Sequence, residues 1–170
     1  MTIIEGLVAE HRTFLAVFDE IERALPGVKT MDEMTRLCQF LERLLHNHGE
    51  TEKDLAYIAL DHILKQHDQL TRLYHDHQEL DILLKDVEKI KDIDEARTQF
   101  KKALDASRAH FKDEERTLFP LIETALQIET LQILGKVWKA QSHLSKRVSI
   151  DDALSPRNTG PTKSSSVHRN

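Results

Sequence analysis

The segment HFKDEERTLFP (residues 110–120) places His110 four residues before Glu114. Side chains four residues apart lie on one face of an α-helix, and imidazole nitrogens and carboxylate oxygens are common metal ligands. The segment HGETE repeats the spacing with His48 and Glu52. If both helix faces point into the core, the two His-x-x-x-Glu pairs predict a metal site.

Two further histidines fit the same pattern, in a chain that contains ten. The segment EHRTFLAVFDEI (10–21) resembles DHQELDILLKDV (76–87), and in each a histidine, His11 or His77, is followed by apolar residues at +3, +7 and +10. The repeating unit is therefore one histidine on one helix and His-x-x-x-Glu on the next. Glu10 and Glu115 adjoin these residues in sequence and are candidates for hydrogen bonds to the histidine rings.

The elements that carry these residues are predicted to be four helices. Apolar residues recur at steps of three and four, and no segment alternates convincingly with a period of two. The sequence predicts inward stripes over 7–25, 34–59, 70–87 and 100–125, the last ending in Leu118, Leu121 and Ala125. We expect Pro120 to kink or end the regular helical ladder. The fold class predicted is all-α, an up-down-up-down four-helix bundle.

Turn signals agree with a common level for the four histidines. Pro26-Gly27 ends the first stripe, a capping box at 30–33 opens the second, and Asp92-Ile93-Asp94 separates the third from the fourth. The midpoint of His11 and His48 falls near residue 29, and that of His77 and His110 near residue 93. The midpoint of His48 and His77 then predicts the remaining turn near residue 62.

The inward residues suit two metal ions. Buried glutamates without partners cost several kcal/mol each, and cations between them would remove this cost. Two histidines and one carboxylate for each ion, with open positions, favour non-haem iron, and bridging glutamates would hold the ions about 3.5–4 Å apart. Zinc and manganese also accept these ligands, and His46 with Glu50 is an alternative pair. The chain lacks the Glu-x-x-His motif of ferritin-like bundles. The predicted ligands are His11, His48, Glu52, His77, His110 and Glu114.

Composition limits the other possibilities. A net charge of −5 and a pI near 6.1 give no basic surface for nucleic acid, and no apolar run approaches the length of a membrane helix. Without a signal-peptide pattern we expect a cytoplasmic protein. The single cysteine excludes an internal disulfide framework. The predicted organisation is a bundle over 1–127, a helical extension over 128–148 and a disordered tail over 149–170.

Over residues 1 to about 125 the chain resembles the haemerythrin-like, or HHE cation-binding, family of four-helix di-iron proteins. The resemblance implies that the six residues above bind two irons with an oxo or hydroxo bridge. The respiratory members carry a further histidine where this chain has Leu73, and an aspartate where it has Glu115. Four histidines and two glutamates are closer to the branch that repairs iron centres after nitrosative stress, which typically has an additional N-terminal cysteine-bearing domain.

Two classes of function follow from this site. The first is a binding module that senses, stores or scavenges dioxygen or nitric oxide, or handles iron itself. The second is a redox enzyme acting on peroxide or nitric oxide, or repairing iron centres under oxidative or nitrosative stress. No proton-delivering residue can be identified in the sequence, which favours the binding module. A metal-free helical interaction protein is disfavoured by the inward glutamates.

Overall fold

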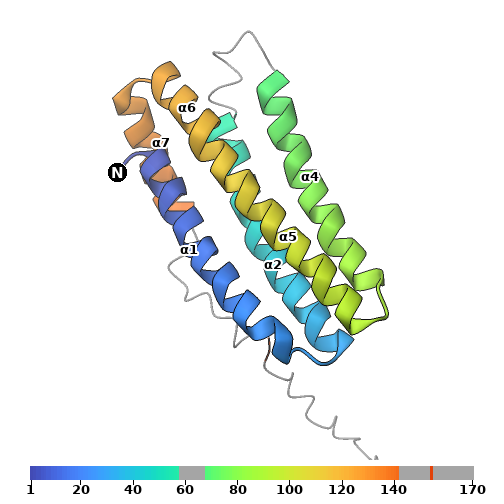
Figure 1. Ribbon diagram of the computed structural model, residues 1–170. Helices are drawn as coiled ribbons and strands as arrows, with labels where there is room; N and C mark the ends of the chain where they lie inside the picture. The colour runs from blue at the N-terminus through green and yellow to red at the C-terminus, as the bar shows by residue number, and fades with distance from the viewer. Residues whose placement is uncertain (58–67, 142–153, 155–170) are drawn as a thin grey trace, which may run out of the picture.

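The computed structural model describes residues 1–57, 68–141 and 154, and this part of the chain contains helices and no strand. Four long helices lie antiparallel in sequence order (Figure 1), which confirms the predicted all-α, up-down-up-down bundle. No described helix is both long and apolar enough to cross a membrane. The four helices are α1 (Ile3–Ala24), α2 (Met31–Glu52), α4 (Asp68–Lys89) and α5 (Ile93–Asp113).

The helix ends form where the sequence supplies caps. Thr30 accepts a hydrogen bond from the backbone N–H of Glu33, whose carboxylate accepts one from the N–H of Thr30, so the predicted capping box is present. Thr2 and Glu5 cap α1 in the same way. Asp92 caps α5, as its place in the predicted break implies. A short 3₁₀ turn, η1 (Leu25–Gly27), joins α1 to the α2 cap. The predicted turn near residue 62 lies outside the described residues.

The second and fourth helices continue into π-helical turns. Segment η2 (Lys53–Tyr57) follows α2, and η3 (Glu114–Leu118) joins α5 to α6 (Phe119–Ala125). The interruption expected near Pro120 takes this form, and the helix continues through the proline to Ala125. Since a π turn accommodates an additional residue, the buried face moves along the chain. Phe119 and Ile122 are therefore buried while the predicted Leu121 and Ala125 are only half-buried.

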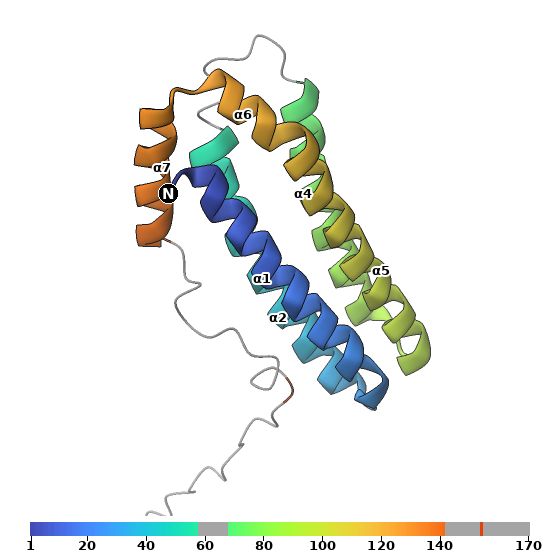
Figure 2. The same cartoon turned by 60° about the vertical axis from the view of Figure 1, so that its left-hand side comes forward.

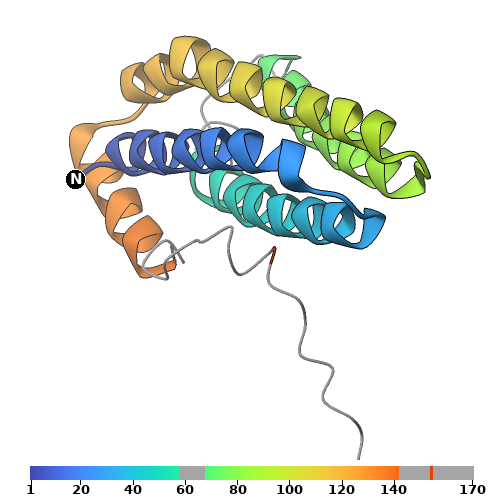
Figure 3. The same ribbon diagram turned by 60° about the horizontal axis from the view of Figure 1, so that its bottom comes forward.

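A further helix, α7 (Ile128–Gln141), packs against α1 (Figures 2 and 3). It begins at the first residue of the predicted extension. The rest of that extension, 142–148, and the predicted tail, apart from Leu154, lie outside the described residues.

The apolar core is divided into two clusters by a polar level. One cluster fills the end of the bundle near the 25–30 and 90–92 turns, and Phe18, Leu41 and Phe100 are among its fully buried members. The other joins the start of α1 to α6 and α7. Along α1, His11 stands between Leu7 of the second cluster and Phe14 of the first. The predicted metal ligands occupy the level between the clusters.

Candidate metal centre

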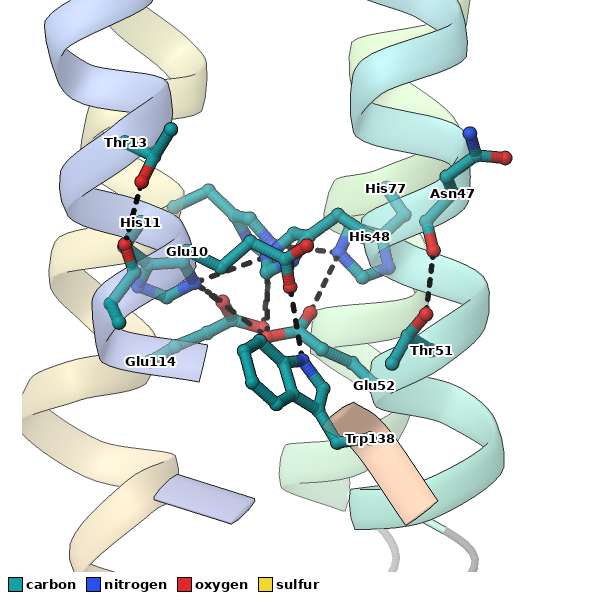
Figure 4. Close-up of polar contacts among 12 residues, drawn as sticks. Glu10, His11, Thr13, Asn47, His48, Thr51, Glu52, His77, Glu114 and Trp138 are labelled. Carbon is teal, nitrogen blue, oxygen red and sulfur yellow. Dashed lines mark hydrogen bonds and ion pairs between the residues drawn. The ribbon is translucent and has the colours of Figure 1, made fainter. Parts of the chain in front are cut away.

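Six polar side chains converge from the four long helices and η3 on the level between the apolar clusters (Figure 4). The His77 side chain is 23% exposed, and the other five are 3% exposed or less. These are the six residues that the spacing of the sequence singles out: His11, His48, Glu52, His77, His110 and Glu114.

The first group of ligand atoms lies between α1 and α2. The Nε2 atoms of His11 and His48 are 3.1 Å apart. Glu52 Oε1 lies 3.3 Å from the Nε2 atom of His48, and Glu114 Oε2 lies 3.5 Å from that of His11. Two imidazole nitrogens and two carboxylate oxygens thus surround one point.

The second group lies between α4 and α5 and uses the remaining oxygens. The Nε2 atoms of His77 and His110 are 2.7 Å apart. Glu52 Oε2 lies 3.6 Å from the Nε2 atom of His77, and Glu114 Oε1 lies 3.4 Å from that of His110. Each glutamate therefore contributes one oxygen to each group. Each group thus contains two carboxylate oxygens instead of the one that an equal division of the ligands predicts, which is the arrangement that the expected bridging glutamates require.

Carboxylates outside the two groups orient the first pair of rings. His11 Nδ1 lies 3.0 Å from Glu115 Oε1, and His48 Nδ1 lies 3.2 Å from Glu10 Oε2. A carboxylate accepts a hydrogen bond, so each neutral ring keeps its proton on Nδ1 and presents an Nε2 lone pair to the other ring. Two lone pairs facing each other at 3.1 Å require a cation or a shared proton between them.

Burial and the carboxylates shift the protonation equilibria. Burial alone would lower the pKa of His11, but Glu114 and Glu52 raise it to about 10. His48 is fully buried, yet Glu52 and Glu10 raise its pKa. Burial and the neighbouring His110 lower the pKa of His77. Without a metal, a proton on His11 that it shares with the facing Nε2 atom of His48 thus takes the place of a cation.

The pKa values of the two glutamates are shifted in opposite directions. Burial and the Glu114 carboxylate raise the pKa of Glu52, whereas for Glu114 the histidines outweigh burial and lower its pKa to about 2. Both Glu52 oxygens are buried and accept no hydrogen bond within the described part of the chain. A buried carboxylate in this state costs several kcal/mol. Cations bound between the histidines would offset this cost, so the donor set fits a pair of metal ions.

Aromatic rings enclose the first group. Phe111 stacks on His11 with ring centroids 4.2 Å apart, and Phe14 meets His48 edge-on at 5.2 Å. Phe119 covers His11 from the other apolar cluster. This side of the centre is closed to water.

A pocket of about 230 Å³ reaches the second group from the surface between α2 and α4. His48, His77 and His110 line its inner part, and Lys53, Glu50 and Asp81 are among the ionisable residues around it. A Cβ atom added at Gly49 would lie 3.2 Å from His77 Nδ1, so a glycine lets this ring pack closely on α2. The pocket gives a small ligand access to His77 and His110.

The alternative pair is not in the cluster. His46 and Glu50 are exposed on α2, and neither belongs to a group with metal-ligand geometry among the described residues. His75 is also exposed and pairs with Glu79. His62, His67, His143 and His168 lie outside the described residues.

Sequence reasoning missed two residues that shape the site. Gly49 gave no turn or break signal within a helix, although a glycine there is itself a sign of close packing. Trp138 belongs to the predicted extension, and nothing in the spacing of the bundle connects it to the histidines. Its indole N–H donates to Glu10 Oε2 at 3.3 Å.

Comparison with known proteins agrees with this geometry. Residues 2–124 match the family model described as Hemerythrin HHE cation binding domain. No curated protein and no solved structure matches the chain. The family match and the two His/Glu groups together point to the binding of metal ions, with iron the metal they favour.

Proposed function

The chain belongs to the hemerythrin HHE cation-binding family, and we propose that it is a non-haem di-iron protein that binds, senses or scavenges dioxygen or nitric oxide, or handles iron. The observation that carries this proposal is the sharing of both glutamates between two histidine pairs. A single ion would need only one oxygen from each carboxylate. Two oxygens from each, facing opposite pairs of Nε2 atoms, suit a pair of ions.

Iron bound here would supply redox-active positions that can accept a diatomic molecule. The protein's own residues orient the ligands, exclude water and leave a route for a small ligand. Glu115 and Glu10 hold the rings of His11 and His48 with their Nε2 lone pairs inward. Phe111 excludes water from the His11 side. The pocket beside His77 is the route by which a small ligand would arrive.

A di-iron redox enzyme acting on peroxide or nitric oxide, or repairing iron centres, is the second candidate. The observation that favours it is the set of ionisable side chains around the pocket, His46, Lys53 and Asp81 among them. Such groups can exchange protons between bulk water and a reacting ligand. A cytoplasmic location stays a prediction from the sequence.

The first experiment is elemental analysis of the protein purified without added metal, together with its visible spectrum. We expect about two irons per chain, as the two groups imply, and absorption bands that are lost in His77→Ala and Glu114→Ala. His46→Ala and Glu50→Ala are matched controls, since they repeat the same residue types on the exposed side of α2. A metal-free protein that stays folded after chelation would refute the proposal.

The two candidates separate in a second assay on the loaded protein. A spectral change that reverses when dioxygen or nitric oxide is removed, without turnover, supports the binding module. Catalytic loss of hydrogen peroxide or nitric oxide that depends on His77 supports the enzyme.

A further inference from the structure

A chain of two hydrogen bonds joins α7 to the candidate metal centre. Trp138 is the only tryptophan of the sequence, and its side chain is buried. Its Nε1–H donates to Glu10 Oε2 at 3.3 Å, and His48 Nδ1 contacts the same oxygen at 3.2 Å (Figure 4). One carboxylate oxygen thus serves both the indole and a predicted metal ligand. Helix α7 lies outside the residues that match the family model.

Two glycines make this arrangement sterically specific. A Cβ atom at Gly6 would lie 2.8 Å from the indole ring of Trp138, so the ring rests directly on the backbone of α1. A Cβ atom at Gly135 would lie 2.5 Å from the carbonyl oxygen of Met1. Helix α7 therefore packs closely on the start of α1 and on the two residues before it, through Trp138 and Gly135, which lie about one helical turn apart on α7. The docking determines where the indole N–H points.

The shared oxygen has a predictable effect on His48. A carboxylate that accepts the Nδ1–H makes an imidazole a stronger electron donor at Nε2. The indole N–H donates a hydrogen bond to the same oxygen. This bond fixes the orientation of the carboxylate and weakens the hydrogen bond that the carboxylate accepts from His48 Nδ1–H. Hydrogen bonding around the ligands is one of the means by which a protein sets the reduction potential of bound iron.

We propose that Trp138 is a positioning residue of the metal centre, acting on His48 through Glu10, so that the docking of α7 tunes the electron-donating strength of this ligand. This role rests on the proposed function, because it requires a metal at His48. It assigns α7 a part in the centre that the matched family region does not contain.

The hydrogen bond can be tested without any metal. Since the chain has one tryptophan, a ¹⁵N–¹H spectrum contains a single indole N–H resonance. A bond to a carboxylate moves this resonance downfield, and Glu10→Gln is expected to move it upfield. Glu115→Gln is the matched control, because Glu115 bonds to His11 and not to the indole. An indole resonance unchanged in Glu10→Gln would overturn the proposal.

The tuning is tested by the reduction potential of the iron-loaded protein. Trp138→Phe keeps an aromatic ring on Gly6 but removes the indole N–H. The hydrogen bond from His48 to Glu10 becomes stronger, so the reduction potential should fall. Glu10→Gln removes the negative charge and should raise it. Ile133→Ala is the control, since it changes an exposed side chain of α7 and leaves the buried face that docks on α1 intact.

The outcomes distinguish this role from the proposed function. Opposite shifts in Trp138→Phe and Glu10→Gln, with none in Ile133→Ala, support the role. A loaded protein whose potential is the same in all three variants refutes the role and leaves the di-iron function intact. A wild-type chain that binds no metal refutes both. If Trp138→Phe does not fold, the indole N–H resonance in Glu10→Gln decides, because only a bond between Trp138 and Glu10 makes that resonance depend on the carboxylate.

Discussion

Glu52 and Glu114 illustrate what residue types and spacing can and cannot predict. Their positions one helical turn after a histidine predicted that both would enter the core, and both are fully buried. Bridging glutamates were expected, but the sequence did not predict which oxygen would face which histidine pair, because this depends on side-chain rotamers and on the separation of four helices. The same holds for Glu10 and Glu115, whose contacts with the histidines the sequence suggested only by proximity.

The protonation of the histidines predicts how metal binding depends on pH. The pKa of His11 is raised to about 10, and that of His48 is also raised. At neutral pH the His11 ring of the metal-free protein carries a proton that an incoming ion must displace. The apparent affinity for zinc or ferrous iron should therefore increase as the pH rises toward about 10. Calorimetry in two buffers of different ionisation enthalpy measures the protons released, and binding without proton release would contradict this.

At the level of elements, each predicted ligand glutamate lies where an α-helix changes into a π turn. Glu52 is the last residue of α2 before η2, and Glu114 is the first residue of η3. The two repeats therefore share the π turn that follows the glutamate as well as the His-x-x-x-Glu spacing. π turns often mark functional sites. Simple helical spacing could not predict them, and this explains why the buried face after Leu118 was predicted one or more residues out of place.

The docking of α7 on α1 gives a prediction at this scale. Gly135→Leu places a side chain where backbone atoms of Met1 and Thr2 already lie 2.5–2.7 Å from a Cβ position. We expect α7 to be displaced, Trp138 to become exposed and its fluorescence emission to shift to longer wavelength. Gly27→Leu is the matched control, since no atom of the described residues lies within 4 Å of its Cβ position. Equal emission in both variants would show that α7 is not held at Gly135.

For the whole molecule, the pattern of the core was predictable because the four stripes share one polar level. Local signals that agree with one another predicted the order of the helices, the caps at Thr30 and Asp92, and the meeting of the four histidines. The contact of Trp138 with Glu10 joins residues 128 positions apart. No periodicity within a helix reports such a contact, so the part of the site contributed by α7 could not be predicted.

Metal binding should also stabilise the core far from the site, and Cys38 provides the means to measure this. Its side chain is 2% exposed in the apolar cluster, and burial, with Glu88 and Glu42 nearby, raises the pKa of its thiol to about 12. Alkylation of this thiol therefore requires unfolding of the bundle. An ion at 100 times its dissociation constant stabilises the folded state by about 2.7 kcal/mol, so iron should slow alkylation about 100-fold. In Glu114→Ala added iron should have no such effect. A Cys38 that reacts equally fast with and without iron in the wild type would show that the site and the core are not thermodynamically linked.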